Sequence, residues 1–232
     1  MPAFSRHRHG FAIPGLVTVL LLSSCATTTT VPQSPPKERG TFRKADLVEL
    51  VKLDPTIHLD VRYATPNNFT GQPVYRQARA FLQRDAAEAL VRVNRALHEK
   101  GWGIVVFDGY RPWSVTKHFW EITPKDKRER GFVANPAKGS KHNRGAAVDL
   151  SMYELSSGKE ADMPSGYDEF SDRAFADYPG GTSRQRWLRD LLRKAMENEG
   201  FSVYDEEWWH FDYKDWKKYP IGIKTFEELG AK

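Results

Sequence analysis

The sequence has only one cysteine, Cys25, among its 232 residues. A single cysteine cannot form a disulfide within the chain, so the folded part must be stabilised by a hydrophobic core. The 35 lysines and arginines barely outnumber the 30 aspartates and glutamates, and they form no continuous basic stripe. We therefore expect no nucleic acid as a partner, and no protein partner is evident. Seven tryptophans and a hydrophobic fraction of 40% are sufficient for a sizeable core.

The chain also lacks an apolar run that could comfortably span a bilayer. Residues 11–22 are apolar but too few; Arg6 and Arg8 precede them, and small residues lead from them to Cys25. This pattern resembles a bacterial lipoprotein signal, in which the cysteine becomes the lipidated first residue of the mature chain. We therefore predict a signal peptide at 1–24 and a membrane-anchored lipoprotein of the cell envelope, on its periplasmic or extracytoplasmic face. The alternative is an ordinary secretory signal with a cysteine near its end by chance.

Composition divides the rest of the chain into a tether and one domain. Residues 25–44 begin with the expected lipidated cysteine and are rich in Thr, Pro and Ser, which suits a flexible tether. Residues 45–232 have a globular composition. Apolar periodicity there predicts strands at 57–63, 103–107, 201–204 and 208–213 and helices at 84–100, 114–122 and 183–198, the last with Ser183 as N-cap and Trp187 in its apolar stripe. Strands and helices alternate without a regular βαβ rhythm, which predicts an α+β fold with a central antiparallel sheet flanked by helices.

The stretch 140–149 (SKHNRGAAVD) contains the first candidates for chemistry. It changes from a polar, glycine-flanked loop into a strand-like apolar run that carries Asp149. A carboxylate among apolar neighbours is costly to bury unless another group pairs with it. His142 is a suitable companion, because imidazole and carboxylate together bind zinc well. The alternative is a partly exposed loop histidine and an aspartate held by backbone donors.

Two further stretches complete a possible zinc site. Residues 207–211 (EWWHF) place Glu207 three residues before His210, and Arg111 lies on a sharp turn after a predicted strand. A catalytic zinc needs three protein ligands and an open position, which His142, Asp149 and His210 satisfy. Glu207 would then act as a base on metal-bound water, and Arg111 would stabilise a developing oxyanion.

Each of these residues also has a purely structural interpretation. Glu207 and His210 could be surface residues of an aromatic-rich edge strand. Arg111 could simply pair with Asp108, an arrangement that is common in stable folds. The residues alone leave both alternatives open.

The motifs together carry a family resemblance. S-x-H-x-x-G-x-A-x-D at 140–149 and E-x-x-H at 207–210 follow DVRYAT at 60–65, NF at 68–69 and DGYRP at 108–112. Their order resembles the D-alanyl-D-alanine dipeptidases, zinc peptidases of the VanX type within the wider group of D-Ala-D-Ala carboxypeptidases, over roughly residues 46–220. The resemblance implies a single zinc-peptidase domain with one Zn²⁺ per chain. It assigns the zinc ligands to His142, Asp149 and His210, the catalytic base to Glu207, and transition-state stabilisation to Arg111.

The same resemblance places Tyr63, Ser140 and Asp168 near the dipeptide pocket. Residues 163–168 (MPSGYD) depart from the family pattern, since Gly-Tyr stands where Pro-Phe or a similar pair is expected, and this bears on substrate fit. The implied activity is hydrolysis of D-alanyl-D-alanine to two D-alanines, in the metabolism of peptidoglycan precursors or fragments. The alternatives are a D,D-carboxypeptidase acting on peptidoglycan stem peptides and a non-catalytic cell-wall-binding lipoprotein. Glu207 argues against the last, because a closed structural zinc site has no use for a base.

Overall fold

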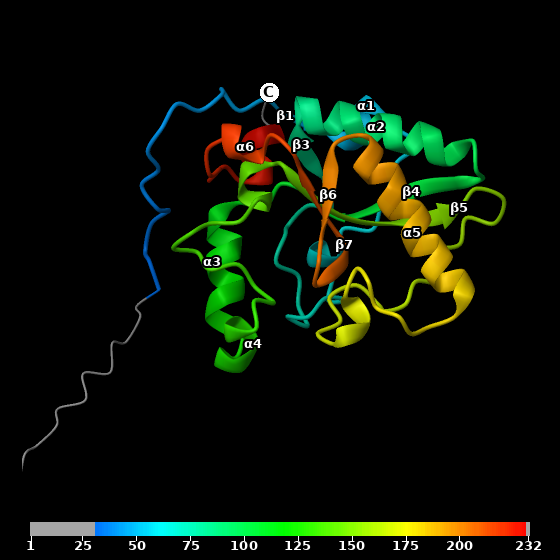
Figure 1. The fold of residues 1–232 in the computed structure, drawn as a ribbon. Coiled ribbons are helices and arrows are strands. Elements are labelled where there is room, and N and C mark those ends of the chain that lie inside the picture. Colours follow the sequence, from blue (N-terminus) through cyan, green and yellow to red (C-terminus); the bar gives the residue numbers. More distant parts are fainter. Residues whose placement is uncertain (1–30, 231–232) are drawn as a thin grey trace, which may run out of the picture. The chain divides into compact units, whose positions relative to one another are not determined.

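A five-stranded sheet in the order β2-β4-β5-β7-β6 forms the centre of the computed structural model, which describes residues 31–230 (Figure 1). Its strands are β2 (His58–Leu59), β4 (Trp102–Asp108), β5 (Ala147–Glu154), β6 (Phe201–Tyr204) and β7 (Glu207–Tyr213). β2 joins β4 in parallel, and the remaining pairs are antiparallel. A second, two-stranded antiparallel sheet pairs β1 (Leu47–Glu49) with β3 (Phe81–Gln83). The predicted α+β class with a largely antiparallel central sheet is confirmed.

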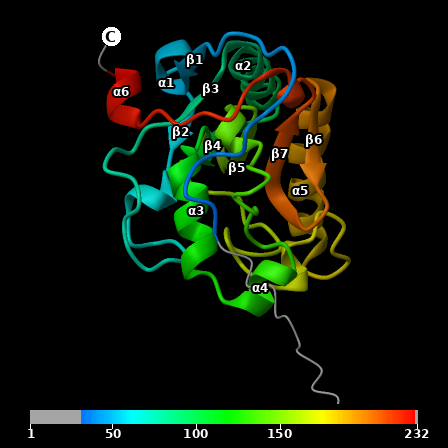
Figure 2. The same ribbon diagram turned by 90° about the vertical axis from the view of Figure 1, so that its left-hand side faces the viewer.

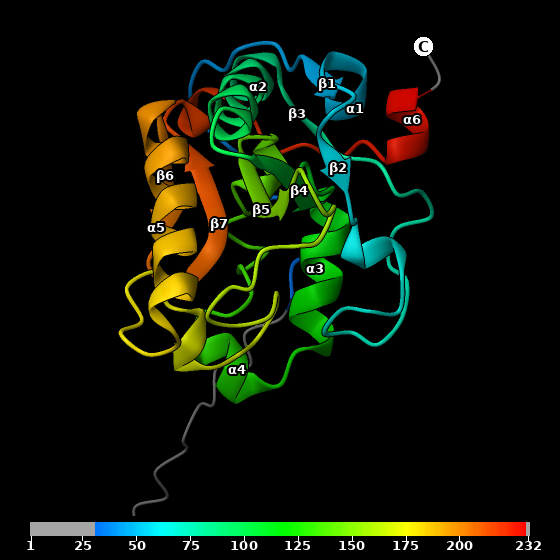
Figure 3. The ribbon, with the colours of Figure 1, turned by 90° about the vertical axis from the view of Figure 1, so that its right-hand side faces the viewer.

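The helices of residues 31–230 are α1 (Leu50–Leu53), α2 (Arg84–His98), α3 (Trp113–Ile122), α4 (Lys125–Glu129), α5 (Ser183–Asn198) and α6 (Phe226–Gly230), with short 3₁₀ helices η1 (Arg62–Ala64), η2 (His142–Arg144), η3 (Asp172–Ala174) and η4 (Trp216–Lys218). Of these, α2 and α5 pack against the central sheet. Figures 2 and 3 show strands β5 and β7 between α5 and α3 in projection, and the two helices pack in different hydrophobic clusters, α5 in the main core and α3 with Tyr63 and Phe81. Within residues 31–230, no helix is both long enough and apolar enough to cross a membrane.

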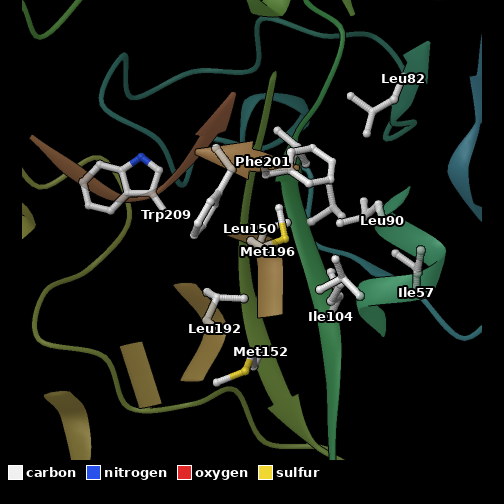
Figure 4. Packing of buried hydrophobic residues seen from close by; sticks show 14 of the residues in the cluster. Ile57, Leu82, Leu90, Ile104, Leu150, Met152, Leu192, Met196, Phe201 and Trp209 are labelled. Carbon is white, nitrogen blue, oxygen red and sulfur yellow. The ribbon is translucent and has the colours of Figure 1, made fainter. Parts of the chain in front are cut away.

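The main hydrophobic core lies between the central sheet and the pair α2 and α5. Leu150 and Met152 of β5 and Ile104 of β4 are fully buried in it, and so are Leu90 of α2 and Leu192 of α5 (Figure 4). These helices form because their apolar residues recur at helical spacing, which gives each helix one side to bury. The core therefore fixes one face of β5 and leaves the opposite face to a separate cluster of side chains.

Three local predictions differ from the structure. The strand predicted at 57–63 is limited to β2, because the chain then enters η1 and the Tyr63 carbonyl accepts hydrogen bonds from two loop N–H groups instead of a strand. The cap of α5 is Thr182 rather than Ser183; Thr182 and Gln185 form a reciprocal capping box. Trp187 is 53% exposed, because the buried residues of α5 lie on a stripe that begins one residue later.

The signal-peptide prediction and Cys25 lie outside the described residues. Of the predicted tether, residues 31–44 are described, and two of them contact the domain. The Glu38 carboxylate accepts hydrogen bonds from Arg144 Nη2 at 2.5 Å and from the Ile221 N–H at 2.7 Å. Arg43 Nη1 donates to Asp85 at 2.7 Å. The domain therefore holds both Glu38 and Arg43, although the sequence places them in the tether.

Candidate active site

The three predicted zinc ligands lie together, and the register of the sheet explains why. Asp149 of β5 is the register partner of His210 in β7, and on its other side it is the partner of Asp108 in β4. His142 comes from η2, which ends at Gly145 in the left-handed conformation at φ 64°, where the chain turns into β5. One ligand atom from each of His142, Asp149 and His210 lies within 4.8 Å of the others.

Hydrogen bonds outside the cluster orient both imidazoles. His142 Nδ1 lies 2.7 Å from the Gly109 carbonyl oxygen, so its N–H donates there and Nε2 faces Asp149 Oδ1 at 3.3 Å. His210 Nε2 lies 3.0 Å from Asp212 Oδ1, and its Nδ1 lies 3.0 Å from Asp149 Oδ1. The two inward nitrogens are 3.1 Å apart. Two nitrogens, each on a ring that a second partner orients, and one carboxylate oxygen form a donor set that fits zinc.

The electrostatics of the cluster favour a cation. Burial raises the pKa of Asp149, but the charges and hydrogen bonds of His142 and His210 outweigh it and hold this pKa well below its usual range. Burial lowers the pKa of His210, whereas hydrogen bonds to Asp149 and Asp212 raise it to about 10. Carboxylates that stabilise an imidazolium so strongly also stabilise a metal cation bound in its place.

Asp212 and Lys141 support His210, although neither was predicted from the sequence. Asp212 Oδ1 faces His210 Nε2, and the Lys141 ammonium pairs with Asp212 Oδ2. Sequence spacing could have indicated Asp212, because it follows His210 by two residues on a strand and its side chain therefore points to the same face. Asp212 fixes which nitrogen of His210 carries the proton and which faces the cluster.

Glu207 begins β7 and lines the same cavity as the three ligands. Its Oε2 lies 3.8 Å from His210 Nδ1. Burial raises the pKa of Glu207 to about 7, although the neighbouring His210 acts in the opposite direction. β7 lies between β5 and β6, so the alternative of an exposed edge strand is wrong. A carboxylate with a pKa near neutrality is suited to accept and return a proton.

Arg111 follows β4 and is held by a buried ion pair. Its Nε and Nη2 lie 2.9 and 2.8 Å from Asp108 Oδ2, and Tyr75 donates to the other Asp108 oxygen at 2.9 Å. The guanidinium also lies over the Phe119 ring, 4.9 Å from its centroid. The pairing with Asp108, which the structural alternative expects, is therefore present, and it holds the guanidinium in the cavity wall rather than away from it.

Tyr63, Ser140 and Asp168 line the same cavity, whose volume is about 230 Å³. Tyr63 donates to Asp168 Oδ1 at 3.2 Å, while Asp168 Oδ2 is buried without a hydrogen-bond partner. Asp168 is the one non-glycine residue in the described chain with positive φ, at 58°, a conformation that costs energy. Burial raises its pKa well above the usual value. Ser140 Oγ accepts a hydrogen bond from the His142 N–H at 3.2 Å.

Comparison with known proteins gives the family context. A family model described as D-ala-D-ala dipeptidase (Peptidase_M15) matches residues 43–228. The chain is 32% identical to the D-alanyl-D-alanine dipeptidase of Escherichia coli (strain K12) over 78% of this chain and 91% of that protein. It is 34% identical to the D-alanyl-D-alanine dipeptidase of Enterococcus faecium over 75% of this chain and 95% of that protein.

Among solved structures, the chain resembles a VanY D,D-pentapeptidase in complex with Zn(II). The TM-score is 0.38 and the identity 16%, over 60% of this chain and 75% of that chain. The family model and the two dipeptidases cover most of the chain, and the predicted resemblance is confirmed. This protein belongs to the D-ala-D-ala dipeptidase family of peptidases.

Proposed function

We propose that this protein is a zinc-dependent D-alanyl-D-alanine dipeptidase that produces two D-alanines from peptidoglycan precursors or fragments. The observation that carries the proposal is the convergence of His142, Asp149 and His210 in one small cavity with Glu207 and Arg111. Such a cavity holds a ligand set, a base and a fixed cation together. Membership of the dipeptidase family supports the same substrate.

One Zn²⁺ per chain would be held by His142 Nε2, His210 Nδ1 and Asp149 Oδ1, the three atoms that face one another. When bound, zinc polarises the peptide carbonyl and lowers the pKa of a bound water to about 7. The protein residues supply the remaining chemistry. Three protein ligands leave a coordination position for substrate, as a catalytic site requires.

Glu207 carries out the proton transfers, and Arg111 stabilises the negative charge that develops on the substrate. The Glu207 carboxylate takes a proton from the attacking water and delivers it to the nitrogen of the leaving D-alanine. Arg111 donates hydrogen bonds from its guanidinium to the carbonyl oxygen as negative charge develops there. Its ion pair with Asp108 fixes the side chain beforehand, so little reorganisation is required during the reaction.

The opposite ends of a dipeptide have suitable partners in the cavity. Asp168 Oδ2 is buried without a partner, and a substrate ammonium placed beside it and the Tyr63 hydroxyl would favour the charged carboxylate, which burial alone disfavours. The Ser140 hydroxyl keeps its own proton for a substrate oxygen, since its Oγ accepts from His142. Only a free dipeptide has an ammonium so close to the scissile bond. The cavity of about 230 Å³ is large enough for a ligand as small as a dipeptide.

The proposal is tested by incubating the purified protein with D-Ala-D-Ala and, separately, with a stem pentapeptide, with and without a metal chelator. We expect the dipeptide to be cleaved much faster, and the chelator to abolish cleavage until zinc is restored. Faster release of D-Ala-D-Ala or D-Ala from the pentapeptide would indicate a carboxypeptidase instead. Zinc binding without cleavage of either substrate would support a cell-wall-binding protein.

We also propose that Cys25 carries a lipid and anchors the protein at the extracytoplasmic face of a membrane in the cell envelope, following a signal peptide at 1–24. The basic start, the short apolar run and the solitary cysteine support this location. In cells, Cys25→Ser should shift the protein from the membrane fraction to the soluble fraction. Ser24→Ala, which leaves a small residue before the cysteine, is the control. Equal membrane partition of Cys25→Ser and wild type would contradict lipid attachment at this residue.

A further inference from the structure

Tyr167 makes a contact that the proposed chemistry has not used. Its hydroxyl donates a hydrogen bond to Asp149 Oδ2 at 3.1 Å. Oδ1 of the same carboxylate faces the two imidazoles, so the two oxygens have separate partners. Tyr167 lies on the loop between β5 and α5, 18 residues from Asp149.

The Tyr167 ring is fixed by other aromatic side chains. Its centroid lies 4.7 Å from that of Phe107 and 5.6 Å from that of Trp209, and Tyr63 lies across from it at 6.1 Å. A ring packed on three sides has little freedom to swing its hydroxyl away from the carboxylate. The hydrogen bond is therefore a fixed feature of the packing around Asp149.

Arg111 is the other neighbour of Asp149 Oδ2, with Nη2 3.7 Å away. That separation is too long for a hydrogen bond, and Arg111 bonds to Asp108 instead. If the Tyr167 hydroxyl were removed, no other group within hydrogen-bond distance would donate to Asp149 Oδ2. The carboxylate could then rotate toward Arg111, or turn both oxygens toward a metal ion.

We infer that Tyr167 is a positioning residue, which holds Asp149 so that one oxygen faces the metal and keeps Arg111 free for substrate. The inference rests on the proposed function, because it gives Asp149 the role of a metal ligand and Arg111 that of a substrate contact. Supporting partners of ligating carboxylates typically change metal affinity by about 10–100-fold when removed. Tyr167 does not contact the reacting atoms and acts only through Asp149.

The test is Tyr167→Phe, which removes one oxygen and preserves the ring packing. Zinc affinity is measured by competition with a chelator, and we expect it to fall by about 10–100-fold. In Co²⁺-loaded protein, the visible absorption bands should shift in position and intensity, because the Asp149 carboxylate would face the metal in a different orientation. At saturating zinc, kcat should also fall, because a turned Asp149 carboxylate would change the charge next to Arg111, whose Nη2 lies 3.7 Å from Oδ2.

The matched control is Tyr219→Phe, which removes a phenol that donates to the Asp85 carboxylate at 3.3 Å, outside the cavity. It should leave the zinc affinity and the Co²⁺ spectrum unchanged. Thermal unfolding of both metal-free variants shows whether Tyr167→Phe retains the fold. Wild-type zinc affinity and an unchanged Co²⁺ spectrum in folded Tyr167→Phe would overturn the inference. Failure of the proposed function is distinguishable, because wild-type protein would then bind zinc without cleaving D-Ala-D-Ala.

Discussion

The two faces of β5 are equally buried but differ in chemistry. Leu150 and Met152 point into the core between the sheet and the helices, with no exposed surface. Asp149 and Ser151 point to the other face and are 3% and 0% exposed. Burial alone therefore does not distinguish the structural face of this strand from the chemical face.

The difference lies in how each face compensates for its burial. Apolar side chains gain about 25 cal/mol for every Å² removed from water, so Leu150 and Met152 need no particular partner. A buried carboxylate loses its hydrogen bonds to water, and protein groups must replace them with hydrogen bonds and opposite charge. For Asp149, these groups are His142, His210 and Tyr167. The core face tolerates exchange among apolar residues, whereas the chemical face depends on each individual partner.

The largest effect should follow removal of a ligand from the chemical face. His142→Ala and His210→Ala each leave two ligands, so zinc content should fall from one per chain to a small fraction, and hydrolysis of D-Ala-D-Ala should be abolished. Elemental analysis after dialysis measures the first effect. His58→Ala is the control, because His58 is an imidazole stacked on Tyr153 outside the cavity. Full zinc retention in either ligand variant would remove that histidine from the ligand set.

The second effect separates chemistry from metal binding on the same face. Glu207→Gln keeps the size of the side chain but cannot accept a proton, so kcat should fall by about 10⁴-fold, the upper end for a general acid–base residue that serves two steps. Zinc content should remain at wild-type level. The control is Glu206→Gln, a neighbouring carboxylate that does not line the cavity and should stay within a few-fold of wild type. Turnover by Glu207→Gln within tenfold of wild type would show that another group is the base.

The third prediction concerns the core face. Leu150→Ala should lower the free energy of unfolding by about 2–5 kcal/mol, because the fully buried side chain leaves a cavity. Zinc affinity per folded molecule should be unchanged if the two faces are independent. Denaturant unfolding of the metal-free protein measures the stability. Leu155→Ala, at a position 41% exposed in the turn after β5, should change it by less than about 0.5 kcal/mol. A parallel loss of zinc affinity in Leu150→Ala would show that the two faces are coupled.

The contrast between the faces also explains what the sequence could predict. The core face follows local spacing, so the helices at 84–100 and 183–198 were predicted nearly to their ends. The strand predicted at 57–63 was wrong in extent, because its length depends on pairing with β4 and not on its own alternation. Trp187 was wrongly assigned to the buried stripe of α5, which begins one residue later. An apolar residue beside a buried stripe cannot be told from a member of the stripe by sequence alone.

On the chemical face, sequence motifs predicted which residues would gather in the cavity, but not which groups would hold them. His142, Asp149, Glu207 and Arg111 are brought together as predicted. Tyr167 could not be predicted as a partner of Asp149, because Asp149 lies within β5 and Tyr167 comes 18 residues later, on the loop after that strand, so only the fold brings them together. Partners of this kind depend on three-dimensional contacts that no spacing rule records.

The smallest effect should come from a supporting residue that touches the ligand set at one atom. Asp212 receives two donors, His210 Nε2 on one oxygen and the Lys141 ammonium on the other. In Asp212→Asn the side chain keeps only one oxygen, which can accept a hydrogen bond from one of the two donors. Its NH₂ group is itself a donor and cannot accept a hydrogen bond from the other. If the NH₂ group faces His210, the imidazole must move its proton to Nδ1, the nitrogen that would bind zinc. We expect zinc affinity to fall by about tenfold, the lower end for a supporting partner, while Glu207 and Arg111 keep their places.

Asp215→Asn, which removes a carboxylate paired with Lys218 at 2.8 Å outside the cavity, is the matched control for Asp212→Asn. Equal zinc affinities in the two variants would mean that His210 is oriented by β7 alone, and that the chemical face needs fewer specific partners than its burial suggests.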